Sequence, residues 1–153
     1  MGVEIERKFL VLQSYQQGEP ILYRQGYLSR EPGRTVRVRV AGENAWITIK
    51  SSTQNFSRQE FEYPIPLPDA QELLLLCEGF IVEKYRWRVP HGKHTWEVDE
   101  FLGDNSGLIV AEIELDSEDE LFELPPWIGE EVSSDMRYHN SNLSVYPFQQ
   151  WED

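Results

Sequence analysis

Residues 3–11 read Val-Glu-Ile-Glu-Arg-Lys-Phe-Leu-Val, a run in which charged and apolar side chains alternate. The two-residue period of a β-strand sends Glu4, Glu6 and Lys8 to one face and most of the apolar side chains to the other. The same division into a charged front and an apolar back returns on strands that follow along the chain. This recurrence predicts a sheet with one ionic face.

Alternation of apolar and polar residues marks eight candidate strands. Their ranges are 3–11, 24–30, 34–41, 45–51, 57–65, 81–89, 94–101 and 108–116. Short polar breaks such as residues 31–33 and 41–44 separate most of them, and such breaks join antiparallel neighbours. The sheet is therefore expected to be largely antiparallel. A helix is expected from Pro68 to near Gly79, and a second short helix is expected to begin at residues 117–120.

The polar face of these strands is almost purely ionic and is divided by strand into bases and acids. The bases at alternating positions are Arg37, Arg39, Lys50, Arg58, Lys84, Arg86 and Arg88, and the acids are Glu60, Glu62, Glu97, Asp99, Glu112, Glu114 and Asp116. A simply solvated face is one interpretation, although such a face normally mixes Ser, Thr, Gln and Lys. The favoured interpretation is a mainly β protein, an eight-stranded antiparallel barrel that is closed or nearly closed. Its apolar faces would pack outward against a few short helices, and its ionic faces would line a hydrated lumen.

The composition narrows the class of protein. The 153 residues suit a single domain with its own core, and the net charge of −13 excludes general affinity for nucleic acid. No stretch approaches the roughly 20 apolar residues that cross a bilayer, and no secretory signal is evident, so no membrane partner and a cytoplasmic location are expected. Cys77 is alone and is expected to be a buried hydrophobe. His91 and His94 are expected to be exposed turn residues, and His139 carries no recognisable pattern.

The segregated charges suit one kind of chemistry. Arg and Lys grip a polyphosphate through charge-assisted hydrogen bonds, and clustered carboxylates offer the oxygen ligands that Mg²⁺ or Mn²⁺ prefers. A divalent cation between carboxylates and phosphate oxygens polarises the phosphate for transfer or hydrolysis. The sequence has no Walker-type glycine loop, no cysteine pair for zinc and no Gly-x-Ser-x-Gly elbow. Metal-assisted phosphoryl chemistry is therefore the favoured hypothesis.

Several blocks of the sequence also resemble a known family. The run Glu4-Ile5-Glu6-Arg7-Lys8 is similar to the amino-terminal Glu-x-Glu-x-Lys motif of the CYTH superfamily, the triphosphate tunnel metalloenzymes. Further blocks follow in the family's order, at residues 37–39, 48–50, 58–62, 83–86, 97–99, 111–115 and 135–138. The resemblance runs from residue 3 to about residue 140, and it implies an eight-stranded antiparallel tunnel filling one domain, residues 1–153.

The resemblance also implies roles for individual residues. Phosphate oxygens would be held by Lys8, Arg37, Arg39, Lys50, Lys84, Arg86 and Arg137. One or two Mg²⁺ or Mn²⁺ ions would be placed by Glu4, Glu6, Glu60, Glu62, Asp99, Glu112 and Glu114. The residues expected to be catalytic are Lys8, Glu6, Glu114 and Arg39. Arg58 and Arg88 could instead pair with neighbouring acids, Glu97 could lie near the tunnel mouth, and Tyr27 could lie at the rim or serve packing.

The expected activity is hydrolysis of inorganic tripolyphosphate to pyrophosphate and orthophosphate. A class IV adenylyl cyclase, or another enzyme acting on an organic triphosphate such as a nucleotide or thiamine triphosphate, is the alternative, since the same grip on phosphate serves all of these. A noncatalytic polyphosphate or nucleotide sensor is a third reading. The expected partner is a small-molecule polyphosphate or nucleoside triphosphate, and both monomer and homodimer remain open.

Overall fold

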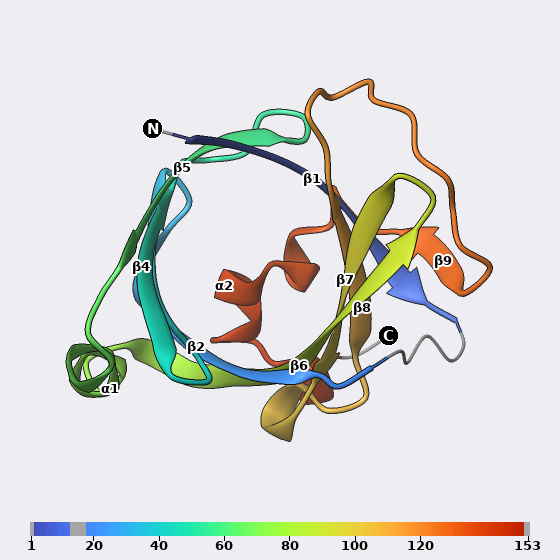
Figure 1. Ribbon diagram of the computed structural model, residues 1–153. Helices are drawn as coiled ribbons and strands as arrows, with labels where there is room; N and C mark the ends of the chain where they lie inside the picture. The colour runs from blue at the N-terminus through green and yellow to red at the C-terminus, as the bar shows by residue number, and fades with distance from the viewer. Residues whose placement is uncertain (1, 13–17, 152–153) are drawn as a thin grey trace.

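The computed structural model describes residues 2–12 and 18–151, and its strands form a ring (Figure 1). The strands of the ring are β1 (Gly2–Val11), β2 (Ile21–Glu31), β3 (Arg34–Ala41), β4 (Asn44–Lys50), β5 (Ser57–Pro64), β6 (Glu78–His91), β7 (His94–Phe101) and β8 (Ile109–Glu114). A ninth strand, β9 (Ile128–Glu131), was not predicted. It pairs with the end of β1 through Phe9 and Val11.

The barrel is closed and antiparallel, as the sequence predicted. Its strands follow the order β5-β4-β3-β2-β6-β7-β8-β1, and β1 pairs again with β5 to complete the circle. Two registers fix this closure: Gly2 lies opposite Glu60 on β5, and Lys8 lies opposite Glu112 on β8. Because β1 lies between β5 and β8, its alternating Glu4, Glu6 and Lys8 face the same interior as the acids of those strands.

The apolar faces of the strands point outward, and the chain covers them with loops and short helices. The largest buried cluster lies between the β1, β6, β7 and β8 wall and the loop after β8, and its residues are Phe9, Trp87, Val89, Trp96, Val98, Ala111, Ile113, Leu115 and Trp127. Helix α1 (Leu67–Leu74) covers β3 and β4 with Ala70 and Leu74. Each large apolar side chain buried in this way contributes about 1.5–3 kcal/mol to stability. The outer layers therefore hold the barrel closed around a polar interior.

The helices are short. Besides α1 they are the 3₁₀ helices η1 (Gly103–Asn105), η2 (Met136–Tyr138) and η3 (Phe148–Gln150), and α2 (Asn140–Leu143). The predicted helix is confirmed where it begins, near Pro68, but it ends at Leu74 and not near Gly79, because β6 already begins at Glu78. Gly79 has a φ of +71° and lies against the Ser144 carbonyl oxygen, so a Cβ atom would not fit there. Among residues 2–12 and 18–151, no helix has the length and apolar character needed to cross a membrane.

Two local predictions were wrong. Residues 117–120 form a turn and not a helix. There, Ser117 Oγ donates to Asp119 Oδ1 at 2.9 Å, and Glu120 Oε1 accepts from the Asp116 backbone N–H at 2.6 Å, so side chains satisfy the local polar groups in place of a helical ladder. His94 is not an exposed turn residue either, since its side chain is only 15% exposed and its Nε2 lies 2.6 Å from Glu120 Oε2.

Candidate active site

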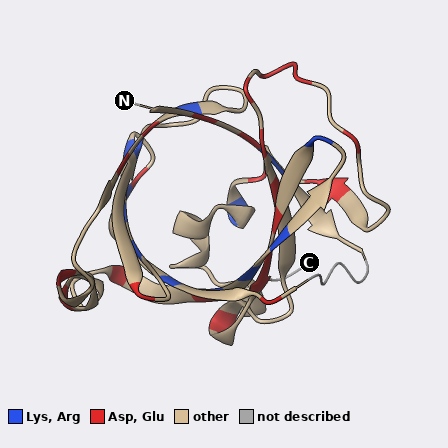
Figure 2. Ribbon diagram, viewed as in Figure 1, with Lys and Arg blue, Asp and Glu red and all other residues tan. Residues whose placement is uncertain are grey.

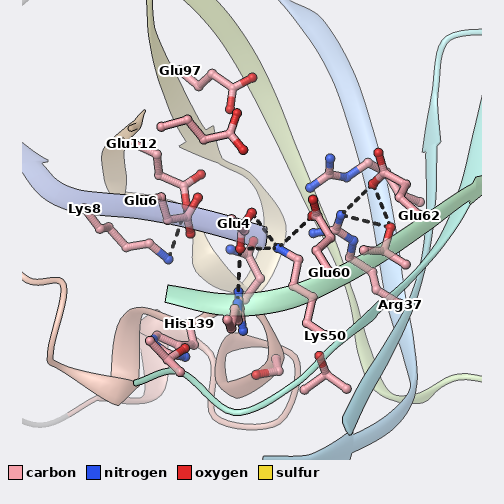
Figure 3. Close-up of a pocket in the computed structure, with 18 of the residues that line it drawn as sticks. Glu4, Glu6, Lys8, Arg37, Lys50, Glu60, Glu62, Glu97, Glu112 and His139 are labelled. Carbon is pink, nitrogen blue, oxygen red and sulfur yellow. Dashed lines mark hydrogen bonds and ion pairs between the residues drawn. The ribbon is translucent and has the colours of Figure 1, made fainter. Parts of the chain in front are cut away.

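A cavity of about 340 Å³ lies inside the barrel, and every strand of the ring contributes side chains to it. Its basic lining residues are Lys8, Arg37, Arg39, Lys50, Arg58, Lys84, Arg86 and Arg88, and its acidic ones are Glu4, Glu6, Glu60, Glu62, Glu97, Glu112 and Glu114. The prediction that the ionic faces share one lumen is confirmed by this lining. Figure 2 shows the charged residues along the strands of the ring, and Figure 3 shows the labelled side chains turned toward one another.

The order of the strands divides the lumen into two walls. Strand β2 lies between β3, which carries Arg37 and Arg39, and β6, which carries Lys84 and Arg86. We call these three strands the basic wall. Strand β1 lies between β5 and β8, and these three strands, which we call the acidic wall, carry the glutamates at positions 4, 6, 60, 62, 112 and 114. The interior can therefore present cations and carboxylates to the same bound molecule.

Glu4 is a carboxylate of the acidic wall whose charge is compensated by two cations. Both of its oxygens accept from Lys50 Nζ at 3.0 Å, and its Oε1 also accepts from Arg58 Nε at 3.1 Å. Burial opposes ionisation of Glu4, but the charges of Lys50 and Arg58 outweigh that cost and lower its pKa to about 2. Arg58 thus pairs with a neighbouring acid, which is one of the two roles that the sequence left open.

Glu6, the next carboxylate of the acidic wall along β1, lacks enough positive charge around it. Burial and the charges of Glu112 and Glu4 raise the pKa of Glu6 well above its ordinary value. Glu112 is also buried, but Lys8 and Arg86 hold its pKa well below the ordinary value, and it accepts a hydrogen bond from Glu6. Figure 3 shows Glu6 beside Glu112. The mutual repulsion of the two groups therefore favours the neutral form of Glu6 and the charged form of Glu112.

The donor set of the acidic wall fits a hard divalent cation. Burial and neighbouring glutamates also raise the pKa of Glu60 and Glu114, so a positive ion here would relieve a real charge deficit. Carboxylate oxygens are the ligands that Mg²⁺ and Mn²⁺ take. In residues 2–12 and 18–151, no three His, Cys, Asp or Glu side chains already stand close enough together to hold a metal. The residue types fit, and the side chains are now engaged with one another and with Lys and Arg.

The basic wall contains the cations that lack a full set of partners. Within the described chain, no carboxylate forms an ion pair with Arg39, whose Nε donates to Gln25 Oε1 at 3.1 Å. Burial and the charges of Arg37 and Arg86 lower the pKa of Arg39 to about 10. Arg37 donates through Nη2 to Thr48 at 3.3 Å, but its buried Nε has no hydrogen-bond partner. These two guanidinium groups have the capacity to bind an anion.

Asp99 lies on β7 directly opposite Arg86 of the basic wall and does not itself line the cavity. Its Oδ1 accepts from Arg86 Nε at 2.7 Å, and its Oδ2 lies 2.7 Å from Lys84 Nζ. Burial lowers the pKa of Lys84 to about 7, and it does so against the attraction of Asp99. Asp99 was expected to place a metal, but in this structure its oxygens hold two cations of the basic wall.

The chain after β9 reaches one end of the cavity with residues that were not predicted to line it. His139, Asn140 and Ser141 line the cavity. Asn140 Oδ1 accepts from Lys84 Nζ at 3.1 Å and from Gln25 Nε2 at 3.2 Å, and so ties this segment to the basic wall. Burial and the charges of Lys8 and Arg58 lower the pKa of His139 to about 4, so its imidazole is neutral at pH 7. A segment without strand alternation offers no pattern that predicts such a position.

The remaining predicted residues divide between the lumen and the surface. Tyr27 is 5% exposed and lines the cavity, while Glu97 lines it and pairs at 3.1 Å with Arg88, which is 65% exposed. The structure does not bring Arg137 into the cavity. That side chain pairs with Asp135 at 2.8 Å and lies 4.9 Å from the Trp151 ring on the outside. Lining residues that sequence reasoning missed include Tyr23, Trp46, Phe56 and Ser133.

Comparisons with known proteins agree with this geometry. The family model for the CYTH domain matches residues 2–145. The inorganic triphosphatase of Acetivibrio thermocellus is 46% identical over 156 residues and is covered completely, as is this chain. The inorganic triphosphatase of Nitrosomonas europaea is 40% identical over 149 residues, which cover 93% of this chain and 97% of the relative.

Solved structures show the same fold. The crystal structure of an inorganic triphosphatase superposes with a TM-score of 0.67 and 38% identity, covering 92% of this chain and 97% of the other. A putative adenylate cyclase from Bacillus halodurans superposes with a TM-score of 0.58 over 77% of this chain and 84% of its own, and at 18% identity that likeness concerns the fold alone. With a family model that spans nearly its whole length and a closed barrel lined by opposed basic and acidic walls, the chain belongs to the CYTH domain family.

Proposed function

We propose that the protein is a metal-dependent inorganic triphosphatase that hydrolyses tripolyphosphate to pyrophosphate and orthophosphate. The observation that carries this proposal is the incomplete pairing of Arg37 and Arg39 on the buried basic wall. Arg39 has no ion-pair partner among the described carboxylates, and Arg37 lies 3.6 Å from Glu62 but leaves its buried Nε without an acceptor, so a polyanion would supply acceptors that both groups lack. The two relatives named inorganic triphosphatase, at 46% and 40% identity, support this substrate over others.

The basic wall and the cations beside it would hold the phosphate groups. Arg37 and Arg39 would bind oxygens directly, since their donors are the least engaged. Four further cations now lie 2.7 to 3.6 Å from carboxylates and would also attract the phosphate oxygens of the substrate. They are Lys8, Lys50, Lys84 and Arg86. Together they would neutralise a chain of phosphates that could not otherwise enter a low-dielectric interior.

The acidic wall would hold Mg²⁺ or Mn²⁺ through Glu4, Glu6, Glu60, Glu62, Glu112 and Glu114. When bound, the cation would polarise the phosphate that is attacked. Burial and neighbouring carboxylates raise the pKa of Glu6 and of Glu114, so these two carboxyl groups would be the ones to take up and return a proton. Lys8 Nζ lies 3.5 Å from Glu112 Oε2 and would orient that carboxylate and a phosphate oxygen of the substrate.

The test is release of orthophosphate by the purified protein from tripolyphosphate with Mg²⁺ or Mn²⁺, with an EDTA control. We expect one orthophosphate for each tripolyphosphate, and no further release from pyrophosphate. ATP is the matched organic substrate, and we expect its turnover to be at least tenfold slower. Cyclic AMP from ATP would identify a cyclase, and binding of tripolyphosphate without turnover would identify a sensor; either result would overturn the proposal.

A further inference from the structure

Arg7 lies in the middle of the charged β1 motif, yet its side chain points out of the barrel. It follows Glu6 and precedes Lys8, both of which line the cavity, and Arg7 itself does not line it. Its Nε donates to Glu131 Oε2 at 2.8 Å and its Nη2 donates to Glu131 Oε1 at 2.6 Å. This two-pronged contact is the strongest geometry available to an Arg and a carboxylate. The proposed hydrolysis does not use Arg7, so the contact needs another explanation.

Strand β1 changes its neighbour at this position. On the edge opposite β8, residues 2–5 pair with β5, whereas Phe9 and Val11 pair with β9. Between these stretches, the Glu6 N–H donates to the Phe56 carbonyl at 3.3 Å and the Lys8 N–H donates to Ser133 Oγ at 2.9 Å. The barrel wall therefore has a seam at the residues that bring Glu6 and Lys8 into the lumen.

Arg7 spans this seam from outside. Its guanidinium carbon lies 4.8 Å from the centre of the Phe56 ring, just before β5, and its fork binds Glu131 at the end of β9. The ring of Phe122, in the loop after β8, lies 5.1 Å away. A planar guanidinium can stack and form a fork at the same time, and a Lys ammonium cannot. The position is therefore suited to Arg specifically.

Two sets of contacts connect Arg7 to residues that line the cavity. Glu131 Oε2 also accepts from Ser133 Oγ at 2.6 Å, and that hydroxyl accepts from the Lys8 backbone N–H. On the other side of the seam, Phe56 lines the cavity, and its N–H donates to Glu118 at 3.4 Å. Arg7 is thus linked to the backbone of Lys8 on one side and to the cavity mouth on the other.

We propose that Arg7 is a positioning residue for the active site, because it joins Phe56 to Glu131 across the seam and so fixes the backbone of Glu6 and Lys8. This inference rests on the proposed triphosphatase function. Loosening the seam would displace a cation and a carboxylate of the lumen, and small displacements of such groups lower the rate strongly. Arg7 itself would touch neither the phosphate nor the cation.

The variant Arg7→Met keeps most of the side-chain length and removes both the fork and the charge. The matched control is Arg24→Met, because Arg24 is also a strand residue outside the cavity with a glutamate partner, Glu83, at 3.0 Å. We expect kcat/KM for tripolyphosphate to fall at least tenfold in Arg7→Met and to stay within twofold in Arg24→Met. Both would be measured at a temperature at which circular dichroism shows each variant folded. A kcat/KM within twofold of wild type for Arg7→Met would overturn the proposal.

Three further variants separate positioning from general stability. Glu131→Gln should resemble Arg7→Met, and the double variant should be no slower than the slower single variant, because both break one linkage. Arg7→Lys should recover only part of the loss, since it restores charge without the fork. Ser133→Ala should lower kcat/KM while the ion pair between Arg7 and Glu131 stays intact. This variant replaces Arg7→Met as the test if Arg7→Met does not fold. Additive losses in the double variant would contradict a shared linkage.

Amide hydrogen exchange gives a readout that does not depend on turnover. We expect the amides of Lys8 and Phe56 to exchange at least tenfold faster in Arg7→Met than in wild type and to be unchanged in Arg24→Met. Unchanged exchange at both amides in Arg7→Met would overturn the inference. If the wild-type protein released no orthophosphate from tripolyphosphate, the proposed function would fail, and exchange at these two amides would still decide the role of Arg7.

Discussion

Lys84 Nζ lies 2.7 Å from Asp99 Oδ2, and the two side chains are 0% and 2% exposed. Arg86 binds the other oxygen of the same carboxylate at 2.7 Å. One buried acid therefore compensates two buried cations of the basic wall. Because the barrel must assemble this arrangement without water, Asp99 is as much a condition for folding as a part of the site.

The first prediction concerns Asp99→Asn. Removing one partner of a buried ion pair leaves the other without compensation, which costs about 3–5 kcal/mol of unfolding free energy. The control is Glu83→Gln, which breaks a pair with Arg24 whose side chains are 43–45% exposed and which should change stability by about 1 kcal/mol or less. Urea unfolding of both variants at pH 7 measures the difference. Equal losses in the two variants would show that Asp99 is not the counter-charge of the basic wall.

The second prediction separates function from stability at Arg39. Arg39→Met removes a buried charge that has no described ion-pair partner and keeps an unbranched apolar side chain in its place. We expect the midpoint of thermal unfolding to stay the same or rise, because an uncompensated charge is lost. We also expect KM for tripolyphosphate to increase at least tenfold, since a phosphate donor is lost. Arg24→Met, at a half-exposed residue outside the cavity, is the control and should leave KM unchanged.

The third prediction concerns Glu4→Gln. The amide nearly preserves the shape of the side chain but removes the charge that Lys50 and Arg58 now share. We expect the Mg²⁺ concentration for half-maximal activity to rise at least tenfold, with a smaller change in KM for tripolyphosphate. Titration of activity with Mg²⁺ at saturating substrate, and with substrate at saturating Mg²⁺, separates the two effects. A larger change in KM than in the Mg²⁺ midpoint would place Glu4 on the phosphate and not on the cation.

The barrel could be predicted from the sequence because, within each strand, charged residues that face the lumen alternate with apolar residues that face outward. Residues 36–40 are an example, since three valines alternate there with Arg37 and Arg39. This pattern can be recognised without knowledge of distant parts of the chain. Hairpin turns then order neighbouring strands. The closure of β1 against both β5 and β8 could be inferred from the shared parity of their acids, and the registers agree.

The features that sequence reasoning missed lie where the chain leaves regular strands. His139 and Asn140 reach the lumen from a segment of short helical turns, where no period links a residue to a face. Arg137 was expected to hold phosphate because residues 135–138 resemble a family block, but in this structure its side chain pairs with Asp135, lies over the Trp151 ring and does not line the cavity. Such choices between competing partners depend on tertiary packing, which the sequence pattern does not reveal.

The fourth prediction concerns the dependence of stability on pH and arises from His139. Burial and the charges of Lys8 and Arg58 lower its pKa from 6.5 to about 4 in the folded protein, and Lys50 adds to the effect while Glu112 opposes it. Between pH 4 and 6.5, the unfolded chain therefore binds more protons at this residue than the folded protein. Stability from this residue is present in full above pH 6.5 and is lost as the pH falls toward 4, with a slope of about 1.4 kcal/mol per pH unit at most.

Many carboxylates titrate in the same range, so the test is a difference between two proteins. The variant His139→Gln removes the titrating ring and keeps a neutral polar side chain of similar length. The unfolding free energy of wild type minus that of the variant, measured in urea from pH 4.5 to 7.5, should rise with pH up to about 6.5 and then become flat. A difference that stays constant over the whole range would mean that His139 takes up its proton equally well in the folded and unfolded chains, and that the cations around it do not act on it.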